Sequence, residues 1–477
     1  MNFEDINIDE LLVRFNNYFH KSSNEHFDII ELVALLHHFI VRNDTESIKM
    51  IVGITKMLYP DTLDSKKMEI LGCLIDNKVK QAQDLIRQIE VEDNEIVMFR
   101  ITILLKLNHV SKALDEAQNY LTKHDFSQSA YCDLIQCFTT EGRHKHALNF
   151  AKEGIQKYPD SIEILFQMGV CYDMADKTTK AIQCYKRVIE IDPFEDSAWF
   201  NLAQSYSRIE KYNEALDAIN YGLAIQPHDI LSLNFKADIL TLLDRHQEAI
   251  QTLLDIIDEG GENSEIGIKI AANYLADENF EKALEWIERA ENNTTNKGRI
   301  LLQKFDILMI MERFEDCRKT LDQCFEAGIP LWIIMSKQGT LESYLGNSQK
   351  SLEYMLKAAK LEPNAPSIWA KCSLAAWETG DYKKSKKYIQ KCFAIDPLYE
   401  YGEALWAACN YKLGHNKLFL ESFEYLSDNQ FELTQFLNLC PEFEPNISLI
   451  IDAIKSKRDY HHFLVYTAGD EPASTNN

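Results

Sequence analysis

Apolar residues recur along this chain with the spacing of a helix that is buried on one face. In one segment Trp199, Leu202, Ala203 and Tyr206 stand at i, i+3, i+4 and i+7, which places them on one side of a helix. A second apolar stripe follows after the polar turn Glu210-Lys211-Tyr212. The pattern therefore predicts two helices joined by a short turn, that is, a helical hairpin.

This hairpin pattern repeats every 34 residues. Small residues mark one position of the repeat: Ala113, Ala147, Ala181, Ala215, Ala249, Ala283, Cys317, Ser351 and Ser385. Prolines mark another position in the same register: Pro159, Pro193, Pro227, Pro363 and Pro397. A small side chain lets two helix backbones approach, and proline ends a helix because it cannot donate the next hydrogen bond. Two ladders in one register indicate a tandem array of helical hairpins.

The repeated residues resemble the tetratricopeptide repeat (TPR) family, whose pattern is Trp-x2-Leu-Gly-x2-Tyr followed by Ala, an aromatic residue and Pro. The nearest matches are Trp199-x2-Leu202-Ala203-x2-Tyr206 with Ala215 and Pro227, and Leu165-x2-Met168-Gly169-x2-Tyr172 with Ala181, Tyr185 and Pro193. The resemblance covers most of the chain. It implies an all-α fold, a right-handed superhelical solenoid of about twelve 34-residue helix-turn-helix repeats.

The register divides the chain into four predicted parts. Residues 1–28 are expected to form an N-terminal cap helix, 434–466 a C-terminal capping segment and 467–477 a disordered tail. The solenoid is expected over 29–433, with units that start near 29, 63, 94, 128, 162, 196, 230, 264, 298, 332, 366 and 400. The unit at 400 departs from the family pattern, since Phe419 stands where a small residue is expected.

In this family the first helices of successive repeats line a concave groove that holds partner segments. Carried over to this chain, the resemblance implies a peptide-binding groove at Phe166, Gln167, Phe200, Asn201, Gln204, Arg208, Asn234 and Phe235. Aromatic rings supply contact area there, and carboxamides can pair with a peptide backbone. A secondary set comprises Lys337, Tyr344, Lys371 and Trp377, which could accept an acidic or aromatic segment or be scattered surface residues.

Charge narrows the class of partner. The chain carries 74 acidic against 50 basic residues, a net charge of −24, which disfavours binding to nucleic acid and favours a protein or peptide partner. Eleven cysteines at irregular spacings, mostly inside apolar helical patterns, are typical of thiols in a reducing compartment. The sequence shows neither a secretory signal nor an apolar run long enough to span a membrane, so we expect a cytoplasmic protein.

No motif in the sequence predicts catalysis. His37-His38, His144 with His146, and His461-His462 lack the spacing of metal ligands on one helix face. Neither a glycine-rich phosphate loop nor a nucleophile motif occurs. We therefore expect no catalytic residues, metal or cofactor, and predict a protein-interaction scaffold or adaptor. The alternative is a self-assembling homo-oligomer whose solenoids pair end to end or through the C-terminal units, where Leu405, Trp406, Phe419 and Phe423 are expected to be exposed.

Overall fold

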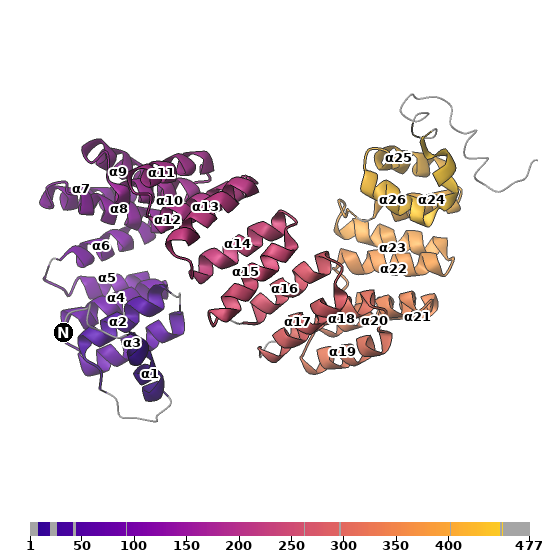
Figure 1. The fold of residues 1–477 in the computed structure, drawn as a ribbon, viewed down its shortest axis with the longest axis horizontal. Helices are drawn as coiled ribbons and strands as arrows, with labels where there is room; N and C mark the ends of the chain where they lie inside the picture. The colour runs from indigo at the N-terminus through magenta and orange to yellow at the C-terminus, as the bar shows by residue number, and fades with distance from the viewer. Residues whose placement is uncertain are drawn as a thin grey trace, which may run out of the picture. The chain divides into compact units, whose positions relative to one another are not determined.

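A computed structural model describes residues 8–19, 26–41, 44–91, 93–261, 263–294, 297–400, 402–448 and 451. Within these residues regular structure is helical, with 26 α-helices, a short 3-10 helix and no strand (Figure 1). The predicted all-α repeat fold is confirmed. The tail predicted over 467–477, residues 452–466 of the capping segment, and residues 1–7 and 20–25 lie outside the described part.

The chain packs into two compact units, residues 1–245 and 246–477. The first contains α1 (Ile8–Phe19), α2 (Ile29–Val41), α3 (Thr45–Leu58), α4 (Leu63–Ile75), α5 (Val79–Ile86), α6 (Asn94–Lys106), α7 (Val110–Lys123), α8 (Gln128–Thr140), α9 (His144–Lys157), α10 (Ile162–Met174), α11 (Thr178–Ile191), α12 (Asp196–Arg208), α13 (Tyr212–Ile225) and α14 (Ile230–Leu242). The second contains α15 (His246–Asp258), α16 (Ser264–Ala276), α17 (Phe280–Asn292), α18 (Gly298–Ile310), α19 (Phe314–Glu326), α20 (Leu331–Tyr344), α21 (Ser348–Leu361), α22 (Pro366–Glu378), α23 (Tyr382–Ile395), α24 (Glu403–Lys412), α25 (Asn416–Leu426), α26 (Gln430–Leu439) and the 3-10 helix Pro441–Asn446.

Side-chain caps begin many of the first helices of the hairpins. Ser161 accepts a hydrogen bond from the backbone N–H of Ile164 at the start of α10, at 3.2 Å. Asp229 does the same for Ser232 at the start of α14, at 3.0 Å. Each cap satisfies a backbone donor that the first turn of a helix leaves unpaired.

In the ten hairpins from α6–α7 to α24–α25, the turn contains a residue in the left-handed conformation. These residues also recur every 34 positions: Asn108, Gly142, Asp176, Glu210, Asp244, Glu278, Glu312, Gly346, Gly380 and Gly414. The next residue closes the turn, as when the N–H of Lys211 donates to the carbonyl of Tyr206 at 3.0 Å. This is the helix-ending arrangement in which glycine is the residue with least strain. The hairpin turns therefore share one backbone geometry although their side chains differ.

Small side chains bring the two helices of a hairpin together. Ala215 on α13 and Ala203 on α12 are both fully buried. In the preceding hairpin a Cβ added to Gly169 would lie 2.6 Å from the Tyr185 ring. Such a contact is too short, so Gly169 must lack a side chain for Tyr185 to pack.

The C-terminal end of the second unit corrects one expectation. Leu405, Phe419 and Phe423 are 5%, 1% and 0% exposed, and therefore belong to the core rather than to an exposed surface for self-association. The rings of Phe419 and Phe436 lie 5.9 Å apart, because α26 and the 3-10 helix cover the hairpin of α24 and α25. The small alanines of α24, among them Ala407, make room for Phe419. The sequence pattern does not indicate this cover.

Candidate partner-binding groove

The predicted groove residues of the first unit lie on α10, α12 and α14, the first helices of three successive repeats. Each helix turns its core stripe toward its hairpin partner. On α12 that stripe includes Ala203, which is fully buried. With 3.6 residues per turn, Asn201 and Gln204 point about 150° and Phe200 about 110° away from the middle of the stripe, and all three are half-buried. The sequence therefore places these three side chains on a surface that a partner can reach.

Two aromatic rings connect neighbouring repeats on this surface. Phe200 and Phe235 meet edge to face, with ring centroids 5.7 Å apart. Asn201 lies beside Phe200, and its Nδ2 donates to the backbone carbonyl of Ser197 at 2.8 Å. That bond fixes the orientation of the carboxamide while the side chain remains half-buried. Asn234 is half-buried next to Phe235 and makes a further interaction within the protein.

Arg208 is more engaged within the protein than the sequence indicates. Its Nη1 lies 3.2 Å from Asp173 Oδ1 on α10. Asp173 also accepts hydrogen bonds from the hydroxyls of Ser205 at 2.8 Å and Tyr185 at 3.1 Å. Burial, and next the charge of Asp173, raise the pKa of the Tyr185 hydroxyl. This network joins two repeats, so Arg208 has a structural role besides any role in the groove.

Gln167 and Phe166 complete the predicted set. The Oε1 atom of Gln167 is buried and accepts no hydrogen bond from the described residues. Phe166 packs against Tyr185, with ring centroids 5.8 Å apart. Phe166 thus supports the hairpin of α10 and α11 and exposes only part of its ring.

The secondary set lies on α20 and α22 of the second unit. Lys337 pairs with Asp306 at 2.5 Å, and Tyr344 is 69% exposed. The residue Lys371 as a whole is exposed to solvent. Its ammonium group, however, is packed against the protein and donates a hydrogen bond to Ser336 Oγ at 3.3 Å. Burial, and next the charge of Lys337, lower the pKa of Lys371. The ring centroids of Trp377 and Tyr382 lie 4.7 Å apart, and Trp377 also packs against the C-terminal core.

Two hollows beside the predicted residues are not indicated by the repeat pattern. One, of about 630 Å³, is lined from α4, α6 and α8 by residues that include Phe99, Thr102 and Gln136. Thr102 and Gln136 stand three and two repeat periods before Gln204, so this hollow is on the face of the repeats that carries the predicted groove residues. The signal that could have revealed it is the apolar Phe99 at the position that Asn201 occupies in its own repeat.

The second hollow, of about 530 Å³, is in the second unit and includes one predicted residue, Lys371. Leu374 on α22, Leu405 on α24, and Phe431 and Gln435 on α26 also line it. Phe431 belongs to a helix that follows the repeat register only loosely, so the repeat pattern gave no reason to select it.

The described residues contain no cluster of three or more potential metal ligands. In the same part of the chain, none of the helices combines the length and the apolar composition needed to cross a membrane.

The tetratricopeptide repeat family matches the chain at residues 163–194, 184–217 and 366–397. These matches agree with the helical hairpins and with the 34-residue register, which are features of a stacked helical repeat protein. The chain is a tetratricopeptide repeat protein.

Among curated relatives, the chain is 24% identical over 241 residues to the Protein CTR9 homolog of Arabidopsis thaliana, which covers 46% of this chain and 21% of that protein. It is 25% identical over 276 residues to a TPR repeat-containing protein of Methanocaldococcus jannaschii, covering 51% of this chain and 46% of that protein. The chain therefore spans less than half the length of these two relatives. A solved tetratricopeptide repeat protein from Parabacteroides merdae is 14% identical with a TM-score of 0.39, covering 52% of this chain and 98% of that chain.

Proposed function

We propose that this protein is an interaction scaffold that holds an extended segment of a partner protein on its groove face. The observation that carries the proposal is the Phe200–Phe235 contact, which bridges two repeats on an accessible surface beside Asn201. Exposed aromatic area next to oriented carboxamides suits a peptide, because the rings bury area and the amides pair with its backbone.

The proposal includes binding rather than catalysis, and a protein rather than a nucleic acid as partner. The net charge of −24 supports the second point, since phosphate backbones would be repelled. Membership in a repeat family whose hairpins occupy most of the described chain supports the first.

We also propose that the protein works in a reducing compartment such as the cytoplasm. All eleven cysteines are free thiols, and eight of them are buried. Burial raises the pKa of Cys372 and of Cys440 to about 12, which keeps these thiols protonated and unreactive near neutral pH.

The test is an affinity capture that compares the parent with a Phe200→Ala/Asn201→Ala/Phe235→Ala variant. We expect a partner that the parent captures and the variant loses, since the variant lacks the aromatic bridge. The matched control is Phe325→Ala, because this ring is 67% exposed and belongs to α19, a helix that contributes no residue to the proposed groove. A partner that the triple variant retains but a Phe99→Ala/Gln136→Ala variant loses would move the site to the hollow between α4 and α8.

Light scattering after size-exclusion chromatography tests the self-assembling alternative. A monomer over the micromolar range would remove it. A dimer would require a surface other than Leu405, Phe419 and Phe423, which are buried.

A further inference from the structure

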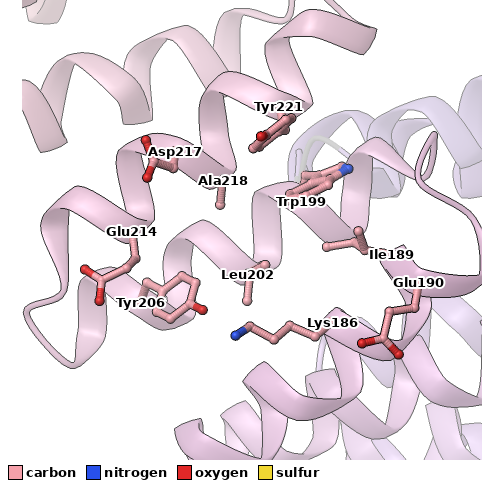
Figure 2. A pocket seen from close by; sticks show the side chains of 10 residues that line it. All are labelled: Lys186, Ile189, Glu190, Trp199, Leu202, Tyr206, Glu214, Asp217, Ala218 and Tyr221. Carbon is pink, nitrogen blue, oxygen red and sulfur yellow. The ribbon is translucent and has the colours of Figure 1, made fainter.

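A pocket of about 340 Å³ lies on the side of α12 opposite to Phe200 and Asn201. Residues of α11, α12 and α13 line it (Figure 2). In this view Leu202 and Ala218 lie between the Trp199–Tyr221 pair and Tyr206, so aromatic rings stand at both ends of the pocket. Trp199 and Tyr221 stack with centroids 4.7 Å apart, and the Trp199 indole N–H donates to the Pro193 carbonyl at 2.9 Å.

Carboxylates surround these rings. Glu190, Glu214 and Asp217 line the pocket together with one lysine, Lys186. Lys186 approaches the Tyr206 ring, with Nζ 5.7 Å from its centroid. Three carboxylates against one ammonium leave a net negative lining. Glu214 pairs with Lys211 at 3.6 Å, a solvent-exposed ion pair that contributes little to stability.

The second unit contains an equivalent position that is filled. Trp369 stands five repeat periods after Trp199 and makes the same bond to a proline carbonyl, Pro363, at 2.8 Å. There Tyr388 replaces Ala218 and stacks on the tryptophan, with centroids 6.0 Å apart. The pocket beside Trp199 therefore exists because Ala218 lacks the ring that occupies this place in the other repeat.

The filled repeat also shows which chemistry the tryptophan accepts. Lys391 Nζ lies 3.9 Å from the centroid of the Trp369 ring, so the protein's own cation binds there. In the repeat of Trp369, the positions equivalent to Glu190, Glu214 and Asp217 are occupied by Lys360, Lys384 and Lys387. The repeat of Trp369, where a lysine of the protein lies over the ring, therefore has basic residues around the tryptophan. The repeat of Trp199, where the pocket is open, has acidic residues at the same positions.

We infer that the pocket beside Trp199 binds an arginine side chain of a partner protein, at a site separate from the proposed groove. A guanidinium can stack on an aromatic face and donate paired hydrogen bonds to a carboxylate, which an ammonium cannot do in one plane. The open place at Ala218, the rings of Trp199 and Tyr206, and the carboxylates Glu214 and Asp217 supply these contacts together.

The test follows the indole signals in NMR spectra of the full chain with ¹⁵N-labelled tryptophan. The chain has six tryptophans, and Trp199→Phe identifies the signal of interest. The probe is N-acetyl-arginine-methylamide, and its neutral counterpart is N-acetyl-citrulline-methylamide. We expect the arginine probe to shift the Trp199 signal in a saturable way and to leave Trp369 unchanged. We expect the citrulline probe to bind at least about tenfold more weakly, since it lacks the cation.

Two variants then test the pocket itself. Ala218→Tyr copies Tyr388 and should abolish the shift by filling the pocket. Glu214→Gln/Asp217→Asn keeps the volume and should raise the dissociation constant about tenfold, because two charges are lost. The control is Asp322→Asn/Glu326→Gln, which removes two exposed charges from α19 and should change nothing. Equal binding of the citrulline probe, or an unchanged shift in the Ala218→Tyr variant, would overturn the inference.

Discussion

The repeats that contain Trp199 and Trp369 share a backbone plan and differ in what their surfaces offer. Both tryptophans donate to a proline carbonyl six residues earlier, at 2.9 and 2.8 Å. In the first repeat Tyr221 stacks on the tryptophan and a pocket remains open. In the second, Tyr388 and Lys391 occupy the space around the ring. The comparison shows that the repeat positions fix the hairpin, while neighbouring positions decide whether a site is open or filled.

The helix faces predicted to line the groove also differ between the same two repeats. Asn201 and Gln204 in the first repeat correspond to Lys371 and Leu374 in the second. The first presents neutral carboxamides, and the second presents an ammonium group and an apolar side chain beside the hollow near Phe431. A single chain can therefore offer two surfaces of different chemistry on one repeated scaffold.

The largest expected effect tests the shared crossing of the two helices. Ala215→Leu forces a side chain between two packed backbones and should lower the free energy of unfolding by about 3 kcal/mol. Ser385→Leu, at the equivalent position, should have a similar effect and should also break the contact between the Ser373 and Ser385 hydroxyls at 2.9 Å. Denaturant unfolding followed by circular dichroism measures both. Lys211→Leu on an exposed turn is the control, and the same loss in this variant would show that the register is wrong.

A smaller effect on the free energy of unfolding should distinguish the repeat of Trp199, with its open pocket, from the repeat of Trp369. Tyr388→Ala removes a half-buried ring from Trp369 and should lower the free energy of unfolding by about 2 kcal/mol. Ala218→Tyr should change it by less than about 1 kcal/mol, because the side chain enters existing space. Unfolding curves of the two variants provide the comparison. Similar losses in both would mean that the pocket beside Trp199 is not equivalent to the site of Tyr388.

The turns should respond in opposite directions. Glu210 has φ of 60° and Gly380, five periods later, has φ of 77°. Glu210→Gly should raise the free energy of unfolding by about 0.5–1 kcal/mol because it relieves left-handed strain. Gly380→Ala should lower it by about 1 kcal/mol for the same reason. Thermal melts of both variants give the sign, and a stabilising Gly380→Ala would contradict the shared turn geometry.

The smallest effect concerns two lysines whose pKa values move in opposite directions. Burial lowers the pKa of Lys371, whereas the hydrogen bond with Tyr206 raises that of Lys186. Between its lowered pKa and 10.5 the folded chain binds fewer protons at Lys371 than the unfolded chain, so the destabilising contribution of the buried ammonium is relieved as pH rises through that window. The contribution of Lys186 is complete below 10.5 and is lost as pH rises through its raised pKa.

NMR titration of ¹³C-dimethylated lysines measures both pKa values, and Lys371→Arg and Lys186→Arg assign the signals. Lys371 should lose its proton at a lower pH than Lys186 does. The reverse order would show that burial does not desolvate the Lys371 ammonium group.

The sequence by itself determined the repeat. Ala215 and its equivalents, the prolines and the stripe around Ala203 follow from helix periodicity and backbone packing, which act within one hairpin and its neighbour. It also indicated which face of α12 carries Phe200 and Asn201, because helix geometry fixes that face. These features are local, and they recur in one repeat after another along the sequence.

Tertiary structure alone decided which surfaces are open. The cover of Phe419 and Phe423 by α26, the pairing of Arg208 with Asp173, and the pocket left by Ala218 all depend on contacts between helices. The sequence pattern marks an apolar or charged residue but not the neighbour that covers or pairs with it. Burial and pairing are properties of the packed surface, so they emerge only when the repeats are stacked.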